Sequence, residues 1–136
     1  MLLSQLDRKG KLKFLDLALH LASVDGSPTT LESRLLNVML AEVGEDIYKE
    51  YQFSLSDDLD ETIAFFEAKS VAVRGIVYLN LLRLTMLDDF YNTLEHGLLE
   101  EVRERFSIGQ QKKERLMRLV YLEKDLMSRA MRVVAS

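Results

Sequence analysis

Apolar residues recur every three to four positions through most of this 136-residue chain, and this spacing constrains the fold more than any other feature. One proline, Pro28, and six glycines interrupt the pattern. The sequence shows neither the alternating β-branched residues nor the frequent turn signals that are typical of strands. We therefore expect an all-α protein, a compact bundle of six to seven helices in a single domain over residues 1–136.

Helix boundaries follow from the apolar spacing and from residues that favour caps and turns. Residues 25–28 (DGSP) predict the first loop, and Gly44 suits the left-handed position just past a helix end. Ser56 and Ser70 are suitable N-caps. Residues 70–87 are apolar on most sides, despite Arg83, which predicts that this helix lies at the centre of the bundle. Helices are expected at residues 9–24, 30–43, 46–51, 57–69, 70–87, 93–106 and 110–134.

The chain also contains an internal repeat. A shift of 63 residues without gaps lays residues 25–36 over residues 88–99, and six of these twelve positions are identical. Each copy reads as a helix, an acidic loop and a second helix, over residues 11–44 and 74–107. Such a unit has one apolar face and cannot bury it alone. We therefore expect an internal helix–loop–helix duplication whose two copies bury these faces together.

Residues 21–32 (LASVDGSPTTLE) resemble the motif of the TerB-like domains, a family that includes the tellurite-resistance protein TerB and the N-terminal region of certain DnaJ-type co-chaperones. The motif is a helix end of small residues, an Asp-Gly loop and a Glu seven residues after the Asp, repeated once. The resemblance extends over residues 11–120. It implies a bundle of about seven helices, a bacterial origin, a role in stress response and an acidic site for a divalent metal.

The metal site that the resemblance implies has four carboxylates, carried over by position: Asp25, Glu32, Asp88 and Glu95. Oxygen ligands of this kind suit Ca²⁺, Mg²⁺ or Mn²⁺. The spacing is not that of an EF-hand loop, which needs a Gly at its sixth position and a Glu at its twelfth. The second copy departs from the family pattern, because Asp89 replaces the usual Gly and the bulky residues 90 and 91 follow it.

The same residues support a purely structural interpretation. If Thr29 is a helix N-cap, Glu32 is the third helical residue, and the two form a capping box. Asn92 and Glu95 repeat this arrangement. The loop aspartates would then end the preceding helices through local hydrogen bonds. A Glu in a capping box has less freedom to bind a metal, so the sequence leaves both interpretations open.

The C-terminal helix carries a long apolar stripe that only Glu123 interrupts. About 25 helical residues would extend about 37 Å, which is longer than the core of a small domain needs. Its outer half can wrap back onto its own domain, dock on a second copy to form a homodimer, contact another protein or lie on an anionic membrane surface. The stripe comprises Leu116, Leu119, Val120, Leu126, Met127, Ala130, Val133 and Val134.

Charge and composition narrow the functional classes. Residues 110–136 carry seven basic and three acidic residues, whereas residues 1–109 carry eleven basic and nineteen acidic ones, for a net charge of −4. Because phosphate binding needs a strong basic face, we expect no nucleic-acid partner. The chain has no cysteine, which excludes disulfides and thiolate zinc sites. It lacks an uncharged membrane span and a secretory signal, so we expect a cytoplasmic protein.

The leading function that we expect from the sequence is a non-enzymatic bacterial interaction module of TerB-like type, for which the resemblance implies a divalent cation (Ca²⁺, Mg²⁺ or Mn²⁺) at the acidic loops. The alternative is a metal-free scaffold that oligomerises through its C-terminal helix. A metal-dependent hydrolase is a third hypothesis of low weight, because no nucleophile, phosphate-loop or H-E-x-x-H motif is present. His20 and His96 lie near the acidic loops, but a lone His on a helix is more often a packing or surface residue.

Overall fold

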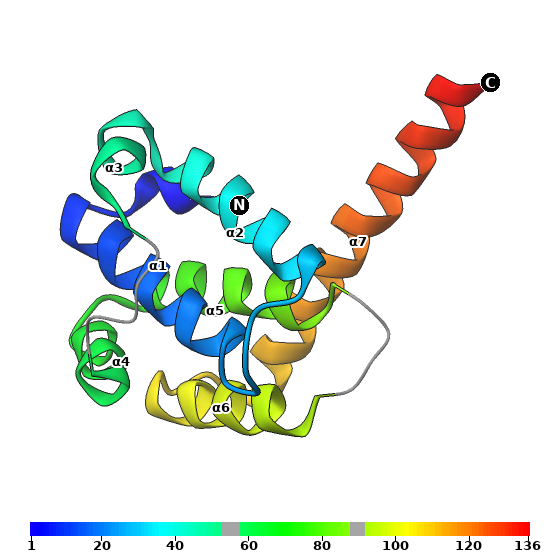
Figure 1. Cartoon of the computed structure of the whole chain (residues 1–136). Coiled ribbons are helices and arrows are strands. Elements are labelled where there is room, and N and C mark those ends of the chain that lie inside the picture. The colour runs from blue at the N-terminus through cyan, green and yellow to red at the C-terminus, as the bar shows by residue number, and fades with distance from the viewer. Residues whose placement is uncertain (53–57, 88–91) are drawn as a thin grey trace.

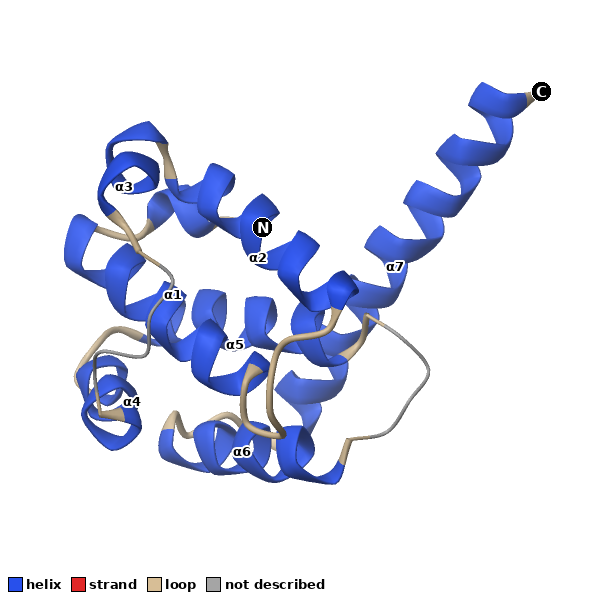
Figure 2. Ribbon diagram, viewed as in Figure 1, coloured by secondary structure: helices blue, strands red, loops and turns tan. Residues whose placement is uncertain are grey.

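A computed structural model describes residues 1–52, 58–87 and 92–136 of the chain. Over these residues the structure is all-helical, with seven α-helices, a short 3-10 helix and no strand (Figure 2). The prediction of an all-α bundle is therefore confirmed. The elements are η1 (Leu3–Gln5), α1 (Arg8–Ala22), α2 (Thr30–Val43), α3 (Glu45–Glu50), α4 (Leu59–Glu67), α5 (Val71–Thr85), α6 (Thr93–Arg105) and α7 (Gln110–Ala135).

Side-chain N-caps begin five of the helices. In each, a side-chain oxygen accepts a hydrogen bond from a backbone amide in the first turn, which satisfies a donor that the helix itself leaves unpaired. The predicted cap at Ser70 is confirmed, whereas Ser56 lies outside the described residues and α4 is capped by Asp58. The capping residues are Asp7, Thr29, Asp58, Ser70 and Asn92.

Two helices, α1 and α5, form the centre of the bundle (Figure 1). Helix α1 packs against α2, α4, α5 and α6, and α5 packs against α4, α6 and α7. Residues 76–82 of α5 are buried without a break, so every side of that helix is covered along two turns. The prediction that this segment lies at the centre is confirmed. Tyr78, Phe14 and Phe66 are the largest fully buried side chains.

The helix positions follow the 63-residue offset of the sequence repeat. Helix α1 begins at Arg8 and α5 at Val71, and α2 begins at Thr30 and α6 at Thr93. Buried positions correspond in the second helix of each pair: residues 32, 36, 39 and 43 lie over residues 95, 99, 102 and 106, and all eight are buried. A common origin of the two halves remains a prediction.

The last helix leaves the bundle partway along its length. Leu116 and Met117 pack against the core, and Val120 is buried. Beyond this point α7 continues straight and projects away from the other helices (Figure 1). Residues 124–136 are all exposed, so the prediction of a long C-terminal helix is confirmed, and the alternative in which its outer half covers its own domain is wrong. We call residues 121–135 the arm, which is about 22 Å long.

In the part of the chain that the structure describes, no helix is both long enough and apolar enough to cross a membrane.

Candidate functional site

The arm and the last turn before it present an apolar face to solvent. Its large side chains are between 47% exposed, at Leu119, and 80% exposed, at Val134. With 3.6 residues per turn, these positions fall on one broad side of the helix. We call this surface the arm face, which comprises Leu119, Leu122, Leu126, Met127, Ala130, Met131, Val133 and Val134.

The opposite side of the arm carries charged and polar residues together with the exposed Tyr121. Arg129 Nε lies 3.0 Å from Asp125 Oδ2, an ion pair one turn apart, and both side chains are at least half exposed. Ser128 and Arg132 lie on the same polar side. The arm is therefore an amphipathic helix that extends beyond the bundle and exposes its apolar face to solvent. An exposed apolar face of this kind is typical of binding surfaces.

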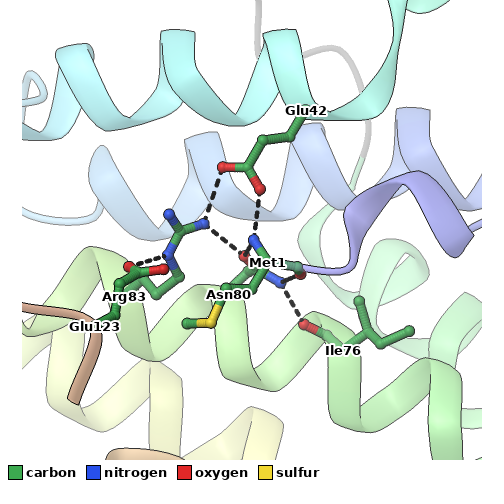
Figure 3. Close-up of polar contacts among 6 residues, drawn as sticks. All are labelled: Met1, Glu42, Ile76, Asn80, Arg83 and Glu123. Carbon is green, nitrogen blue, oxygen red and sulfur yellow. Dashed lines mark hydrogen bonds and ion pairs between the residues drawn. The ribbon is translucent and has the colours of Figure 1, made fainter. Parts of the chain in front are cut away.

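A polar cluster holds the base of the arm (Figure 3). Arg83 of α5 donates from Nε to Glu123 Oε1 of α7 at 3.1 Å and from Nη1 to Glu42 Oε1 of α2 at 3.2 Å. Its Nη1 also donates to Asn80 Oδ1 at 2.9 Å. The Arg83 side chain is only 10% exposed, so this one guanidinium joins three helices at the point where α7 departs.

The same cluster includes the chain's amino terminus. The Met1 ammonium donates to the Glu42 carboxylate and, at 3.1 Å, to Asn80 Oδ1. Asn80 Nδ2 donates in turn to the carbonyl oxygens of Met1 and Ile76, both at 2.8 Å. Burial raises the pKa of the Glu42 carboxyl, but the hydrogen bond from the ammonium and the charge of Arg83 outweigh burial and lower the pKa below its ordinary value. Glu42 is thus held ionised between two cations.

A second cluster fixes the first turns of α7 to α6. Glu100 Oε2 accepts from Arg103 Nη2 at 2.8 Å, and Glu100 Oε1 accepts from Lys113 Nζ of α7 at 2.7 Å. Arg103 Nη1 also donates to the Ile108 carbonyl in the connecting loop at 2.9 Å. The hydrogen bond from Arg103 lowers the pKa of Glu100, burial opposes this, and Lys113 adds to the lowering, so that the pKa falls to about 2.

Acid should weaken this second cluster. Because folding lowers the pKa of Glu100 from 4.5 to about 2, its contribution to stability is present above the unfolded pKa and disappears as pH falls between about 5 and 2. Because the Glu100 side chain is partly exposed, solvent screening reduces the stability that this pKa shift represents. We expect a loss of about 2 kcal/mol in the free energy of unfolding. Urea titrations across this pH range should show a smaller loss for Glu100→Gln. Equal losses in the two proteins would contradict the assignment.

Behind this cluster lies a buried phenol. Tyr78 of α5 is fully buried, and within the described residues its hydroxyl has no hydrogen-bond partner. Burial, together with the nearby charge of Glu100, raises the pKa of Tyr78. We expect Tyr78→Phe to raise the free energy of unfolding by about 1 kcal/mol, because it removes a polar group that lost its water on folding. A urea titration that shows destabilisation instead would reveal a partner for this hydroxyl.

Helix caps and a contact between the repeats organise the described residues around the first acidic loop and at the start of α6. Glu32 is buried and forms the predicted capping box: its Oε1 accepts from the Thr29 amide at 3.0 Å, and its own amide donates to Thr29 Oγ1 at 3.1 Å. In the second copy the Glu95 amide donates to Asn92 Oδ1 at 3.0 Å, and Glu95 is also buried. The capping interpretation is therefore confirmed at Thr29 and Glu32.

The contact between the repeats involves Asp25. Its exposed carboxylate accepts a hydrogen bond from Asn92 Nδ2, the cap of α6, so the first acidic loop lies beside the beginning of the second copy's second helix. The sequence alone did not require this proximity. Asp88, the fourth predicted ligand, lies outside the described residues. Among those that are described, no three His, Asp, Glu or Cys residues form a group that could hold a metal ion.

No protein-family model matches the sequence, and no curated protein or solved structure matches the chain. The TerB-like resemblance therefore rests on the motif in residues 21–32 and on its repeat.

The sequence pattern does not indicate which residues hold the base of the arm. Arg83 and Glu123 each interrupt an apolar segment, and the structure pairs them with each other across α5 and α7. A single charge within an otherwise apolar stripe is a signal for such a buried partner, because an unpaired charge there would be costly.

Proposed function

We propose that this protein is a non-enzymatic interaction module that binds a protein partner through the arm face. The observation that carries this proposal is the exposure of seven large apolar side chains on one side of a helix that projects beyond its own bundle. Monomeric proteins rarely expose contiguous apolar surface of this kind unless it serves for binding. A helix with such a face is suited to a groove or to another helix in the partner.

The energetics favour binding at this surface. Each of the large arm-face side chains is roughly half exposed or more, so its burial on a partner would contribute on the order of 1 kcal/mol. Because the arm is already helical and fixed at its base by Arg83 and Glu123, a partner would meet a preorganised surface. Little ordering of the backbone would then oppose association.

Site-specific photo-crosslinking in the protein's own cells tests this proposal. A photoreactive amino acid at position 126 or 133, on the arm face, should give a discrete crosslinked species. The matched control places the same amino acid at position 128, on the polar side of the arm, and should give none. If positions 126 and 133 yield no species, or no more than position 128, the arm face is not a binding surface.

We also propose that the chain is a TerB-like protein of the bacterial cytoplasm with a stress-related role, built from a duplicated helix–loop–helix unit. The motif in residues 21–32 supports the relation. The 63-residue offset shared by α1 with α5 and by α2 with α6 supports the duplication. A solved structure in which residues 8–43 and 71–106 superpose closely would strengthen this view. Unrelated helix crossing angles in the two halves would count against it.

A second candidate function is binding of a divalent cation at the acidic loops. The contact of Asp25 with Asn92 supports it, because it brings the first loop to the helix start that also carries Glu95. Isothermal titration of Ca²⁺, Mg²⁺ and Mn²⁺ into chelator-treated protein tests it. Saturable binding that disappears in Asp25→Asn/Asp88→Asn would establish a site. Absence of binding for all three ions would leave the loop residues with a structural role alone.

A further inference from the structure

We propose that Met127 and Met131 of the arm form a reversible oxidation site that switches off binding by the arm face. Oxidation of the two thioethers to sulfoxides would make this face polar, and reduction would restore it. The proposal rests on the proposed function of the arm face and adds its regulation. It is carried by the exposure of the chain's methionines and by the position of these two along α7.

The sulfur chemistry of this chain is confined to methionine, because it contains six methionines and no cysteine. The four methionines outside the arm are shielded. Met39 is fully buried, and Met1, Met86 and Met117 are partly buried against the core. The two in the arm have exposed fractions of 60% and 66%, in chain order. Since a peroxide must reach the sulfur atom to oxidise it, the two arm thioethers should react first.

Both arm methionines lie on the side of α7 that enters the core at the base of the helix. They follow the buried Val120 by seven and eleven residues, a spacing that keeps all three side chains on one side of the helix. At Val120 this side packs on the bundle, whereas residues 124–136 are all exposed on the projecting arm (Figure 1). The two sulfoxides would lie one helical turn apart and would interrupt the apolar face near the middle of the arm.

The oxidant is a peroxide from the surroundings, of which hydrogen peroxide is the simplest. A lone pair of the sulfur attacks one peroxide oxygen, an S–O bond forms, the O–O bond breaks and the second oxygen leaves as water. The sulfur loses two electrons and the peroxide gains them. In the reverse step, two thiols of a sulfoxide reductase supply two electrons, become a disulfide and release the sulfoxide oxygen as water.

A sulfoxide opposes burial of the arm face without opposing folding of the bundle. Its S–O group is a polar acceptor, and burying this group against an apolar partner without a donor weakens binding. We expect oxidation of both residues to weaken partner binding roughly tenfold or more. Because both side chains are exposed in the folded chain, the melting temperature of the oxidised protein should equal that of the reduced protein.

Peptide mapping by mass spectrometry measures the selectivity of oxidation. The purified full chain is treated with hydrogen peroxide for increasing times, at a protein concentration low enough to keep it monomeric. Met127 and Met131 should be oxidised nearly as fast as in urea-unfolded protein, whereas Met39 should react many times more slowly than in unfolded protein. Equal rates at Met39 and Met127 in the folded protein, or protection of both arm methionines, would contradict the proposal.

Photo-crosslinking at position 126 in the protein's own cells measures the consequence. Sublethal hydrogen peroxide should lower the yield of the crosslinked species roughly tenfold, and the yield should recover after the peroxide is removed. The matched control is Met127→Leu/Met131→Leu, which keeps the face apolar but cannot be oxidised, so its yield should not change.

The two proposals fail in different ways. If peroxide lowers the yield equally in wild type and control, or lowers it in neither, the oxidation switch is overturned and binding by the arm face stands. If no crosslinked species forms even without peroxide, the proposed function fails and the switch fails with it.

Discussion

Phe66→Ala is expected to lower the free energy of unfolding by about 3–5 kcal/mol. Phe66 of α4 is fully buried and packs edge-to-face against Phe106, with ring centroids 6.2 Å apart. Removing the ring creates a cavity where α4 meets α6, and also removes the aromatic contact. Chemical denaturation measures the loss. Since a small domain has only about 5–15 kcal/mol of stability, this variant should be partly unfolded well below the wild-type melting temperature.

Phe65→Ala is the matched control. Phe65 is adjacent in sequence and also packs edge-to-face on Phe66, at 5.0 Å, but it is partly exposed. The expected loss is about 1–2 kcal/mol, because less apolar surface is uncovered. Equal losses for the two variants would mean that the core between α4 and α6 is not packed as described.

Arg83→Met is expected to lower the free energy of unfolding by about 2–3 kcal/mol. The substitution keeps most of the apolar stem but leaves Glu123 and Asn80 Oδ1 without their guanidinium donor. Removing one member of a buried ion pair costs about 3–5 kcal/mol, and we reduce this value because the side chains of Glu42 and Glu123 are 27% and 33% exposed.

Arg83→Lys separates charge from geometry. A lysine restores one positive charge but cannot donate from two directions to Glu42 and Glu123 at once, so we expect an intermediate loss. If Arg83→Met unfolds at the same urea concentration as the wild type, the cluster does not stabilise the base of the arm.

Local rules explain what could be predicted of the fold. A cap depends on residues within a few positions of one another, which is why the pairing of Thr29 with Glu32 was visible in the sequence. The central position of α5 was also predictable, because a helix with apolar residues on most sides has no polar side to expose to solvent and is therefore buried. The observed helix boundaries differ from the predicted ones by at most two residues at either end.

Tertiary relations could not be predicted in the same way. The bond between Asp25 and Asn92 joins residues 67 positions apart, and nothing local requires it. The apolar stripe of α7 continues smoothly past Val120, although the surface that covers it ends there. A periodic pattern shows that a face is apolar but not what covers it, so the sequence could not distinguish an arm from a helix that folds back.

The central claim is that the arm face serves binding and does not stabilise the bundle that carries it. The most direct measurement is the free energy of unfolding of the triple variant Leu122→Gln/Leu126→Gln/Val133→Gln. It is obtained from a urea titration followed by circular dichroism, at a protein concentration low enough to keep the protein monomeric. These side chains are more than half exposed, so the account predicts a value within about 0.5 kcal/mol of the wild type. A loss of several kcal/mol would contradict it, because the three residues would then be part of the protein's own core.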